Sequence, residues 1–182
     1  MITHSLRLLL IAIMLSPFAV SAAGLPPWQF GMTPAEVRGV KEFGPYKAFS
    51  NGDLETFNGR FKGRKQNVQF FFQNGRLRRI GIYLWEGRDP KKGIPVWQRA
   101  YGLLQADYGR VATPDLKATP GSEPLNAEVL AIAAAVHADV TGRTEMVPAK
   151  QPREMRVSAA FMAYMAREGK SYAIAIFLDP KA

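Results

Sequence analysis

Cysteine is absent from the sequence, and histidine occurs only twice in 182 residues. Without cysteine, the chain has no disulfide, no thiolate metal ligand and no thiol nucleophile. His137 is the one histidine after the first 22 residues, and no serine lies in a Gly-x-Ser-x-Gly motif. We therefore expect no bound metal, no cofactor and no nucleophilic active site, which favours a binding protein over an enzyme.

Long hydrophobic runs are scarce as well. The apolar run Leu8–Leu15 is far shorter than the roughly 20 residues that span a bilayer. It follows a positively charged start and precedes small residues that end at Ala22, which is the order of regions in a secretory signal peptide. We expect residues 1–22 to be a signal peptide, cleaved after Ala22 or Ala23, and residues 23–182 to form one domain. An uncleaved anchor or an ordinary buried helix is the alternative.

Positive charge is in excess, since 24 Lys and Arg face 15 Asp and Glu, a net charge of +9. Removal of the signal peptide with Arg7 leaves +8. An exported chain without cysteine fits a bacterial periplasm. There, such a charge attracts an acidic protein or an anionic cell-envelope polymer, and no nucleic acid is expected. Solubility alone is the other interpretation of the charge.

Capping and terminating residues predict three helices. Thr33-Pro34-Ala35-Glu36 is a capping box with proline at the first helical position, and it opens a helix over residues 33–43. Further helices are predicted over residues 95–108 and 126–140, each closed by a glycine. The third helix has an apolar stripe along one side, formed by Val129, Ile132, Val136 and Val140.

Turn signals and alternating apolar residues predict the strands. Residues 46–86 contain three Asn-Gly pairs, the strongest short hairpin signal, including Asn74-Gly75. A closing hairpin with the two-residue loop Glu168-Gly169 is predicted for strands 154–166 and 171–179, and a short strand for 144–147. The order of elements predicts an α+β fold, with an antiparallel sheet of about five or six strands and three helices packed against it.

The hairpin around Asn74-Gly75 gives two clean faces only with a bulge or a three-residue loop, because a shift of one residue turns every side chain over. With that parity, the core face carries Val68, Phe70, Phe72, Ile80, Ile82 and Leu84. The opposite face carries Phe71, Leu77, Arg79, Tyr83 and Trp85. We expect the second face to be open to a partner; the alternative is that a helix covers its rings.

The run Phe30-Gly31-Met32-Thr33-Pro34-Ala35-Glu36-Val37, followed by Phe43-Gly44-Pro45, resembles the opening of the SmpA/OmlA (BamE-like) envelope proteins. The resemblance covers residues 28–85. It implies a small antiparallel sheet and a non-catalytic scaffolding or binding role at the bacterial envelope, but it does not extend to a lipid-bearing cysteine. The whole chain also resembles uncharacterised exported proteobacterial proteins, which implies no activity.

The candidate partner-binding residues are basic and aromatic side chains of the 46–86 segment. They are Arg60, Lys62, Arg64, Phe71, Arg76, Arg79, Tyr83 and Trp85. Because arginine and aromatic rings are enriched at interfaces, the leading hypothesis is a non-enzymatic periplasmic module that recognises an acidic protein or an anionic envelope component. Two alternatives stay open. One is an envelope glycan hydrolase that uses Asp53 and Glu55; the other is a carrier that holds a small apolar ligand between sheet and helices.

Overall fold

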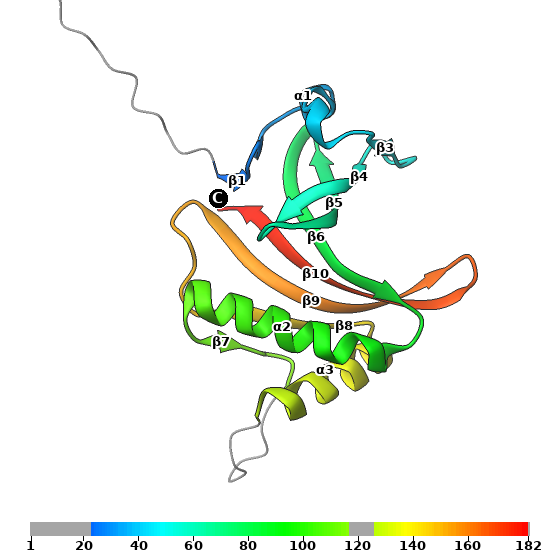
Figure 1. Cartoon of the computed structure of the whole chain (residues 1–182), viewed down its shortest axis with the longest axis vertical. Coiled ribbons are helices and arrows are strands. Elements are labelled where there is room, and N and C mark those ends of the chain that lie inside the picture. The colour runs from blue at the N-terminus through cyan, green and yellow to red at the C-terminus, as the bar shows by residue number, and fades with distance from the viewer. Residues whose placement is uncertain (1–22, 117–125, 182) are drawn as a thin grey trace, which may run out of the picture.

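The computed structural model describes residues 23–116 and 126–181 (Figure 1). The predicted signal peptide, residues 1–22, lies outside the described residues. Within the described ranges, no helix has the length and apolar character needed to cross a membrane. The predicted class, α+β with a large antiparallel sheet and three α-helices, is confirmed.

The described strands form an eight-stranded antiparallel sheet and a separate two-stranded one. The order in the large sheet is β3 (Lys47–Ala48), β4 (Leu54–Phe61), β5 (Arg64–Gln73), β6 (Arg76–Gly87), β10 (Gly169–Pro180), β9 (Met155–Ala166), β8 (Arg143–Pro148) and β7 (Val111–Ala112). The small sheet pairs β1 (Gly24–Leu25) with β2 (Trp28–Gln29). The expectation of five or six strands was too low. The edge strands β3 and β7 have two residues each, too few to leave an alternating pattern in the sequence.

The helices are α1 (Pro34–Gly39), followed by the 3₁₀ turn η1 (Lys41–Phe43), then α2 (Pro90–Tyr108) and α3 (Ala127–Thr141). The predicted capping box is present, with Thr33 and Glu36 bonding each other's backbone amides. Helix α2 begins before the expected Pro95, because the Asp89 carboxylate accepts from the amide of Lys91 at 3.0 Å and Pro90 takes the first position.

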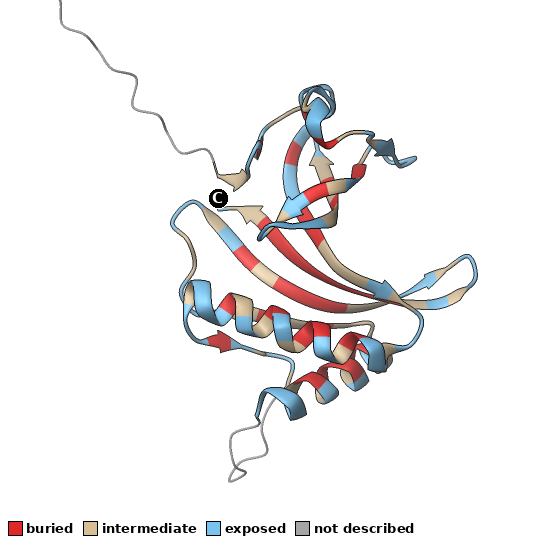
Figure 2. Ribbon diagram, in the orientation of Figure 1, coloured by how far each residue is buried: buried red, intermediate tan, exposed pale blue. Residues whose placement is uncertain are grey.

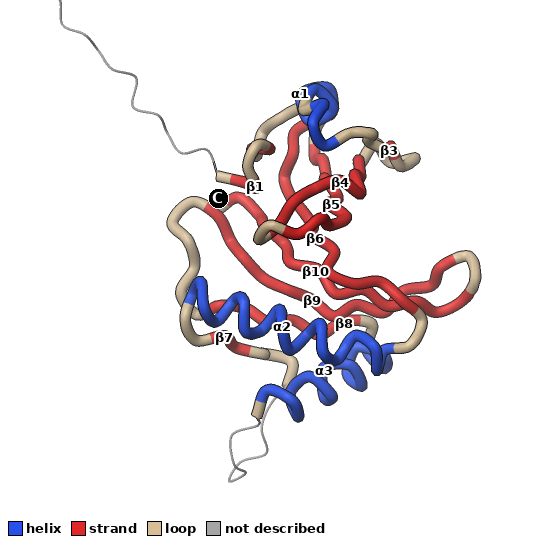
Figure 3. Tube along the Cα trace, in the orientation of Figure 1, coloured by secondary structure: helices blue, strands red, loops and turns tan. Residues whose placement is uncertain are grey.

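Helices α2 and α3 cover one face of the sheet, against β6, β10, β9 and β8 (Figure 1). The segment from β2 to η1 covers the other end of that face, where the ring of Trp28 lies 4.9 Å from the rings of Phe43 and Phe70. One apolar core fills the space beneath these elements, seen as buried bands on the strands in Figure 2. No described helix packs on the opposite face, here named the open face, and Figure 3 shows α2 and α3 together on one side.

A bulge in β6 sets the parity of the β5–β6 hairpin. The turn at Asn74-Gly75 has positive φ at both residues. Phe71 pairs with Arg79, whereas Phe72 pairs with Leu77, so one residue of β6 is extra between these pairs. The expected bulge is therefore present, and Phe71 and Arg79 lie on the open face. The placement of Leu77 was wrong, because it lies on the turn side of the bulge and is fully buried in the core.

A second bulge in β6 separates Tyr83 from Trp85. Tyr83 pairs with Ala175 of β10, whereas Trp85 pairs with the preceding residue, Ile174. Trp85 therefore faces α2, and the centroid of its ring lies 6.2 Å from that of Phe161 in the core. The prediction that Trp85 shares the open face with Tyr83 was wrong, because strict alternation of side chains ends at a bulge.

The β9–β10 hairpin has a two-residue loop and the two faces that its sequence predicts, but the loop is Arg167-Glu168 instead of Glu168-Gly169. The predicted pairing is therefore wrong by two residues, a shift that leaves every side chain on its predicted face because the side-chain period of a strand is two. Ala166 pairs with Gly169 across a two-residue loop, and Phe161 pairs with Ile174 further along. The side chains of Phe161 and Ile174 are buried beneath the helices, while Ala160 and Ala175 belong to a small apolar cluster on the open face.

Helix α3 places its small side chains inward. Its buried residues are Ala131, Ala134, Ala135 and Ala138. Its large apolar stripe is exposed instead, with Val136 at 60% and Val140 at 80% of full exposure. Alanine has the shorter side chain, so this orientation lets α3 approach β8, β9 and α2 closely.

Candidate functional site

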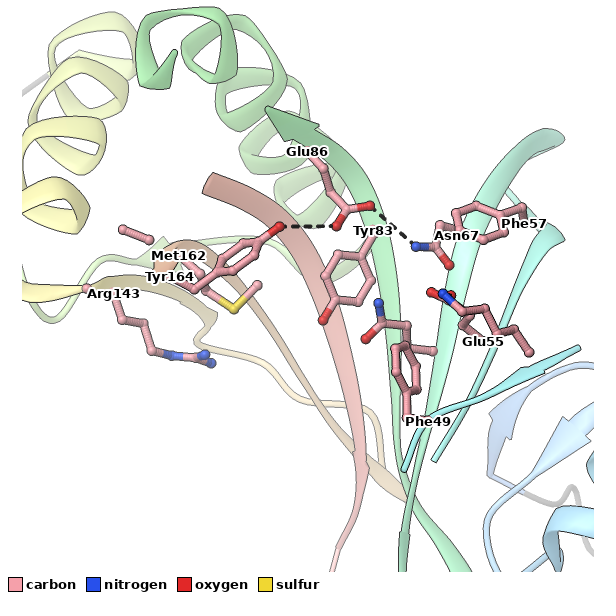
Figure 4. A pocket seen from close by; sticks show the side chains of 13 residues that line it. Phe49, Glu55, Phe57, Asn67, Tyr83, Glu86, Arg143, Met162 and Tyr164 are labelled. Carbon is pink, nitrogen blue, oxygen red and sulfur yellow. Dashed lines mark hydrogen bonds and ion pairs between the residues drawn. The ribbon is translucent and has the colours of Figure 1, made fainter. Parts of the chain in front are cut away.

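A groove of about 670 Å³ crosses the open face from β4 to β8 (Figure 4). We name it the open-face groove. It is lined by Lys47, Phe49, Glu55, Phe57, Asn67, Gln69, Tyr83, Glu86, Gly142, Arg143, Met162, Ala163 and Tyr164. The groove borders a second apolar cluster, separate from the main core, in which Phe71, Tyr83 and Met162 pack against Ala160, Ala175 and Phe177. Its volume lies within the range of ligand-binding clefts.

Tyr83 stands at the centre of this groove. Burial of its ring, with the nearby charge of Glu86 as a smaller contribution, raises the pKa of Tyr83 to about 12. The phenol therefore stays protonated across the physiological range. Because no hydrogen bond within the described chain engages the hydroxyl, it is free to donate a hydrogen bond to a bound partner.

Glu55 is buried in the wall of the groove, with 5% of its surface exposed. Its Oε1 accepts from Nζ of Lys47 at 3.0 Å, and that ammonium also lies 5.6 Å from the ring centroid of Phe49. A buried carboxylate without a partner is costly, so the ion pair explains how Glu55 is accommodated there. The pair leaves this part of the groove without net charge.

Glu86 receives two long hydrogen bonds across the groove, both drawn in Figure 4. Tyr164 Oη donates to Oε1 and Asn67 Nδ2 donates to Oε2, each at 3.4 Å. The pKa of Tyr164 is raised, first by burial and second by the charge of Glu86. Asn67 Oδ1 is buried and makes no hydrogen bond within the described chain. A ligand that donates a hydrogen bond there would satisfy this acceptor.

Two arginines of the open face are held by carboxylates and by one ring. Arg79 makes a bidentate pair with Asp179, at 2.7 Å from Nε and 3.2 Å from Nη2. Arg143 pairs with Glu145 at 2.7 Å. Both guanidinium groups also lie over the ring of Phe177, at 5.2 and 5.3 Å from its centroid. The charges of Arg79 and Arg143 are therefore largely compensated by contacts within the open face, which leaves them less available to an anionic partner.

Other cations of the open face have no carboxylate within 4 Å in the described ranges. Arg60 and Lys65 pair across β4 and β5 and point to this side, and Arg156 lies on it at the opposite end of the face. These three side chains give the two ends of the open face a positive charge.

The structure divides the predicted binding residues among four places. Arg60, Phe71, Arg79 and Tyr83 lie on the open face. Lys62 and Arg64 line a different hollow beside α2. Arg76 donates to the carbonyl of Gly31 at 3.2 Å, near the start of α1, and Trp85 is packed beneath α2. Of the eight predicted residues, only Tyr83 lines the open-face groove. The rest of the lining includes residues that the sequence did not mark as binding residues: Lys47, Phe49, Phe57, Asn67, Glu86, Arg143, Met162 and Tyr164.

The carboxylates proposed for glycan hydrolysis do not act as a pair in this groove. Asp53 Oδ1 accepts from the amide of Phe72 at 2.9 Å, and Oδ2 accepts from Asn51 Nδ2 at 2.7 Å. Asp53 therefore holds the turn before β4, while Glu55 alone lines the groove and pairs with Lys47.

No group of three His, Asp or Glu side chains within the described ranges is placed to hold a metal ion. His137 lies on α3, where its Nδ1 is 2.9 Å from Thr144 Oγ1. It contacts neither the open-face groove nor a carboxylate in the described chain.

These features define an α+β protein with a large antiparallel sheet. The described helices cover one face of this sheet, and the other face carries an amphipathic groove. Comparison with known proteins returns no match, whether to a family model, to a curated protein or to a solved structure. The resemblance of residues 28–85 to BamE-like proteins therefore stays a prediction from the sequence.

Proposed function

We propose that the protein is a non-enzymatic binding module of the bacterial periplasm, whose open-face groove holds a segment of an acidic partner protein. The observation that carries this proposal is the groove itself, on a sheet face that no described helix covers. Phe57 is 57% exposed at its wall and Tyr164 is 42% exposed. Large exposed rings around an amphipathic hollow are typical of interaction sites.

The charges of the groove favour a protein segment over a polyanion. Lys47, Arg79 and Arg143 are already paired with carboxylates of the same face. A polyanion would have to displace these carboxylates, at the cost of leaving Glu55 buried and unpaired. Phenylalanine, tyrosine, methionine and arginine, which line or border the groove, are the side chains enriched in protein interfaces.

The surroundings of the groove favour an acidic partner. Arg60 and Lys65 at one end and Arg156 at the other are without carboxylates in the described chain, and the net charge of the whole sequence is +9. Such a field raises the association rate of a negatively charged partner. The predicted signal peptide and the BamE-like resemblance support a location in the bacterial envelope.

Site-specific photo-crosslinking in the native envelope tests the proposal. A photoreactive residue at position 57 is expected to capture an acidic protein, whereas one at position 136, on exposed α3, is not. The double substitution Phe57→Ala with Tyr164→Ala is expected to reduce recovery of that protein by about tenfold, as loss of interface anchors does. Val129→Ala with Val136→Ala is the matched control, since it removes exposed apolar side chains elsewhere.

The charge contribution is tested separately. Arg60→Glu with Lys65→Glu is expected to slow association of the captured protein and to weaken its dependence on salt, with little change in dissociation. Equal recovery by the Phe57/Tyr164 variant and the wild type would reject the groove as the docking site. Release of fragments from peptidoglycan by the purified protein would instead favour the hydrolase.

A further inference from the structure

A second hollow lies on the other side of the sheet, between α2 and the β4–β5 hairpin. Its volume is about 400 Å³, at the small end of the range for ligand sites. We name it the α2 groove. Its apolar walls include Phe61 and Leu84 from the sheet and Val96 and Leu103 from α2.

The polar residues of the α2 groove are mostly cations. Lys62 is neutralised by Asp107, 2.7 Å away. Arg64 and Arg99 also line the groove, and neither has a carboxylate within 4 Å in the described part of the chain. An apolar hollow is therefore bordered by two arginines that are free to bind an anion, and guanidinium groups match carboxylate and phosphate geometry.

Gly102 keeps the α2 groove open. It lies within α2 and lines the groove, and a Cβ built on it would meet no atom within 4 Å. Glycine inside a helix is less stable than alanine, and here no close contact requires the absence of a side chain. Any larger residue at this position would occupy the hollow.

We propose that the α2 groove binds an anionic amphiphile, a molecule with one hydrocarbon chain and one carboxylate or phosphate head. The chain lies on Phe61, Leu84 and Leu103, and the head binds Arg64 and Arg99. The two arginines favour a ligand with an anionic head over an uncharged apolar molecule. The site lies on the opposite face of the sheet from the open-face groove and is independent of the partner proposed there.

Calorimetric titration of the protein with monomeric laurate, dodecyl phosphate, dodecanol and acetate tests the ligand class. Laurate and dodecyl phosphate are expected to bind saturably, one per chain. Dodecanol is expected to bind about tenfold more weakly and acetate not measurably, since each lacks one half of the ligand. Absence of saturable binding by both amphiphiles overturns the proposal, and so does equal affinity for laurate and dodecanol.

Variants test the location. Arg64→Glu with Arg99→Glu is expected to weaken laurate binding by at least about tenfold and to leave dodecanol binding unchanged. Arg38→Glu with Arg153→Glu makes the same change of net charge away from the groove and is expected to retain laurate. Gly102→Leu is expected to abolish binding of both ligands, while Gly102→Ala keeps at least part of it with a helix at least as stable.

The outcomes separate this site from the open-face groove. Phe57→Ala with Tyr164→Ala is expected to leave laurate affinity unchanged, whatever it does to the partner protein. Unaltered laurate affinity in both Arg64→Glu with Arg99→Glu and Gly102→Leu, each confirmed as folded by circular dichroism, overturns the assignment. Binding to phosphatidylglycerol vesicles without binding of monomeric laurate overturns it in favour of a membrane surface.

Discussion

Tyr83 and Trp85 are two residues apart on β6, yet they lie on opposite faces of the sheet. In a regular strand, side chains two residues apart share a face, so an extra residue between them is required. Because of the bulge, Tyr83 lies in the open-face groove and Trp85 lies beneath α2. This single irregularity divides the aromatic residues of β6 between the open face and the core.

Substitution of the two rings should affect the stability of the protein to different degrees. Trp85→Ala removes a half-buried ring that contacts Phe161, and we expect it to lower the free energy of unfolding by about 2–4 kcal/mol. Tyr83→Phe keeps its ring in the small open-face cluster and should change stability by less than about 0.5 kcal/mol. Urea unfolding followed by circular dichroism measures both; a Trp85→Ala variant as stable as the wild type would contradict the packing described for this ring.

The phenol of Tyr83 should ionise at a higher pH than an ordinary tyrosine. Its pKa is raised from 10.0 to about 12, so the phenolate absorbance of the folded protein should contain a component near that pH that Tyr83→Phe lacks. Because the folded pKa is the higher one, the unfolded chain releases this proton first as pH rises. Stability should therefore fall from about pH 10 towards pH 12. Identical titration curves for the two proteins would show that Tyr83 is not in this environment.

Substitutions on the exposed valine side of helix α3 should change stability little, whereas substitutions on its buried alanine side should destabilise the protein. Ala138 is fully buried, so Ala138→Leu should destabilise the protein by about 1–3 kcal/mol through overpacking. Val136→Ala shortens a side chain that is 60% exposed, and it should alter stability by no more than about 0.5 kcal/mol. Thermal unfolding of both variants measures the contrast, and the reverse order of stability would mean that the valine stripe is the buried one.

Asp139 should make the folded state sensitive to acid. Hydrogen bonds from Lys170, first, and from Tyr172, second, lower the pKa of Asp139 below its ordinary value of 3.8. A carboxyl with a lowered folded pKa stabilises the protein above its unfolded pKa, and that contribution is lost as pH falls through the folded value. The stability of the wild type should therefore fall more steeply below about pH 4 than that of Asp139→Asn, as urea midpoints across acid pH can measure.

Lys170→Met is the companion variant. It removes the donor that lowers the pKa of Asp139 most, so the folded pKa of this carboxyl should move back towards its ordinary value. The acid-dependent loss of stability should therefore be smaller than in the wild type, while the neutral-pH fold is retained. Equal acid sensitivity in the wild type, Asp139→Asn and Lys170→Met would contradict a role for this contact in tying α3 to β10.

Local sequence predicts a part of the fold well. The faces of β9 and β10 follow from clean alternation on both strands, although the loop lies one residue earlier than predicted, at Arg167-Glu168. The capping box at Thr33 and the need for a bulge between Asn74 and Ile80 are also visible in the sequence. Each of these depends on contacts between residues near in the chain, where periodicity and turn chemistry decide the geometry.

The candidate site is predicted only in part. Phe71, Arg79 and Tyr83 follow from the parity of the β5–β6 hairpin, and Arg60 from the basic composition of β4. Of these four residues, only Tyr83 lines the open-face groove. Glu86 lies just beyond the second bulge, and the pattern around it shows no break, because Leu84 and Trp85 are both apolar. One wall of the groove comes from β8 and β9, more than 50 residues further along the chain, and short-range patterns carry no information on that contact.

The sequence by itself determines the α+β class, the hairpins and the helix caps, because each is set by local conformational preference and side-chain periodicity. Only the tertiary structure decides that β6 pairs with β10, which brings Tyr83 and Glu86 towards Tyr164 and joins two hairpins in one sheet. It also decides that alanines rather than valines of α3 are buried, because the close approach of the helix to the sheet outweighs the larger hydrophobic gain of burying valine.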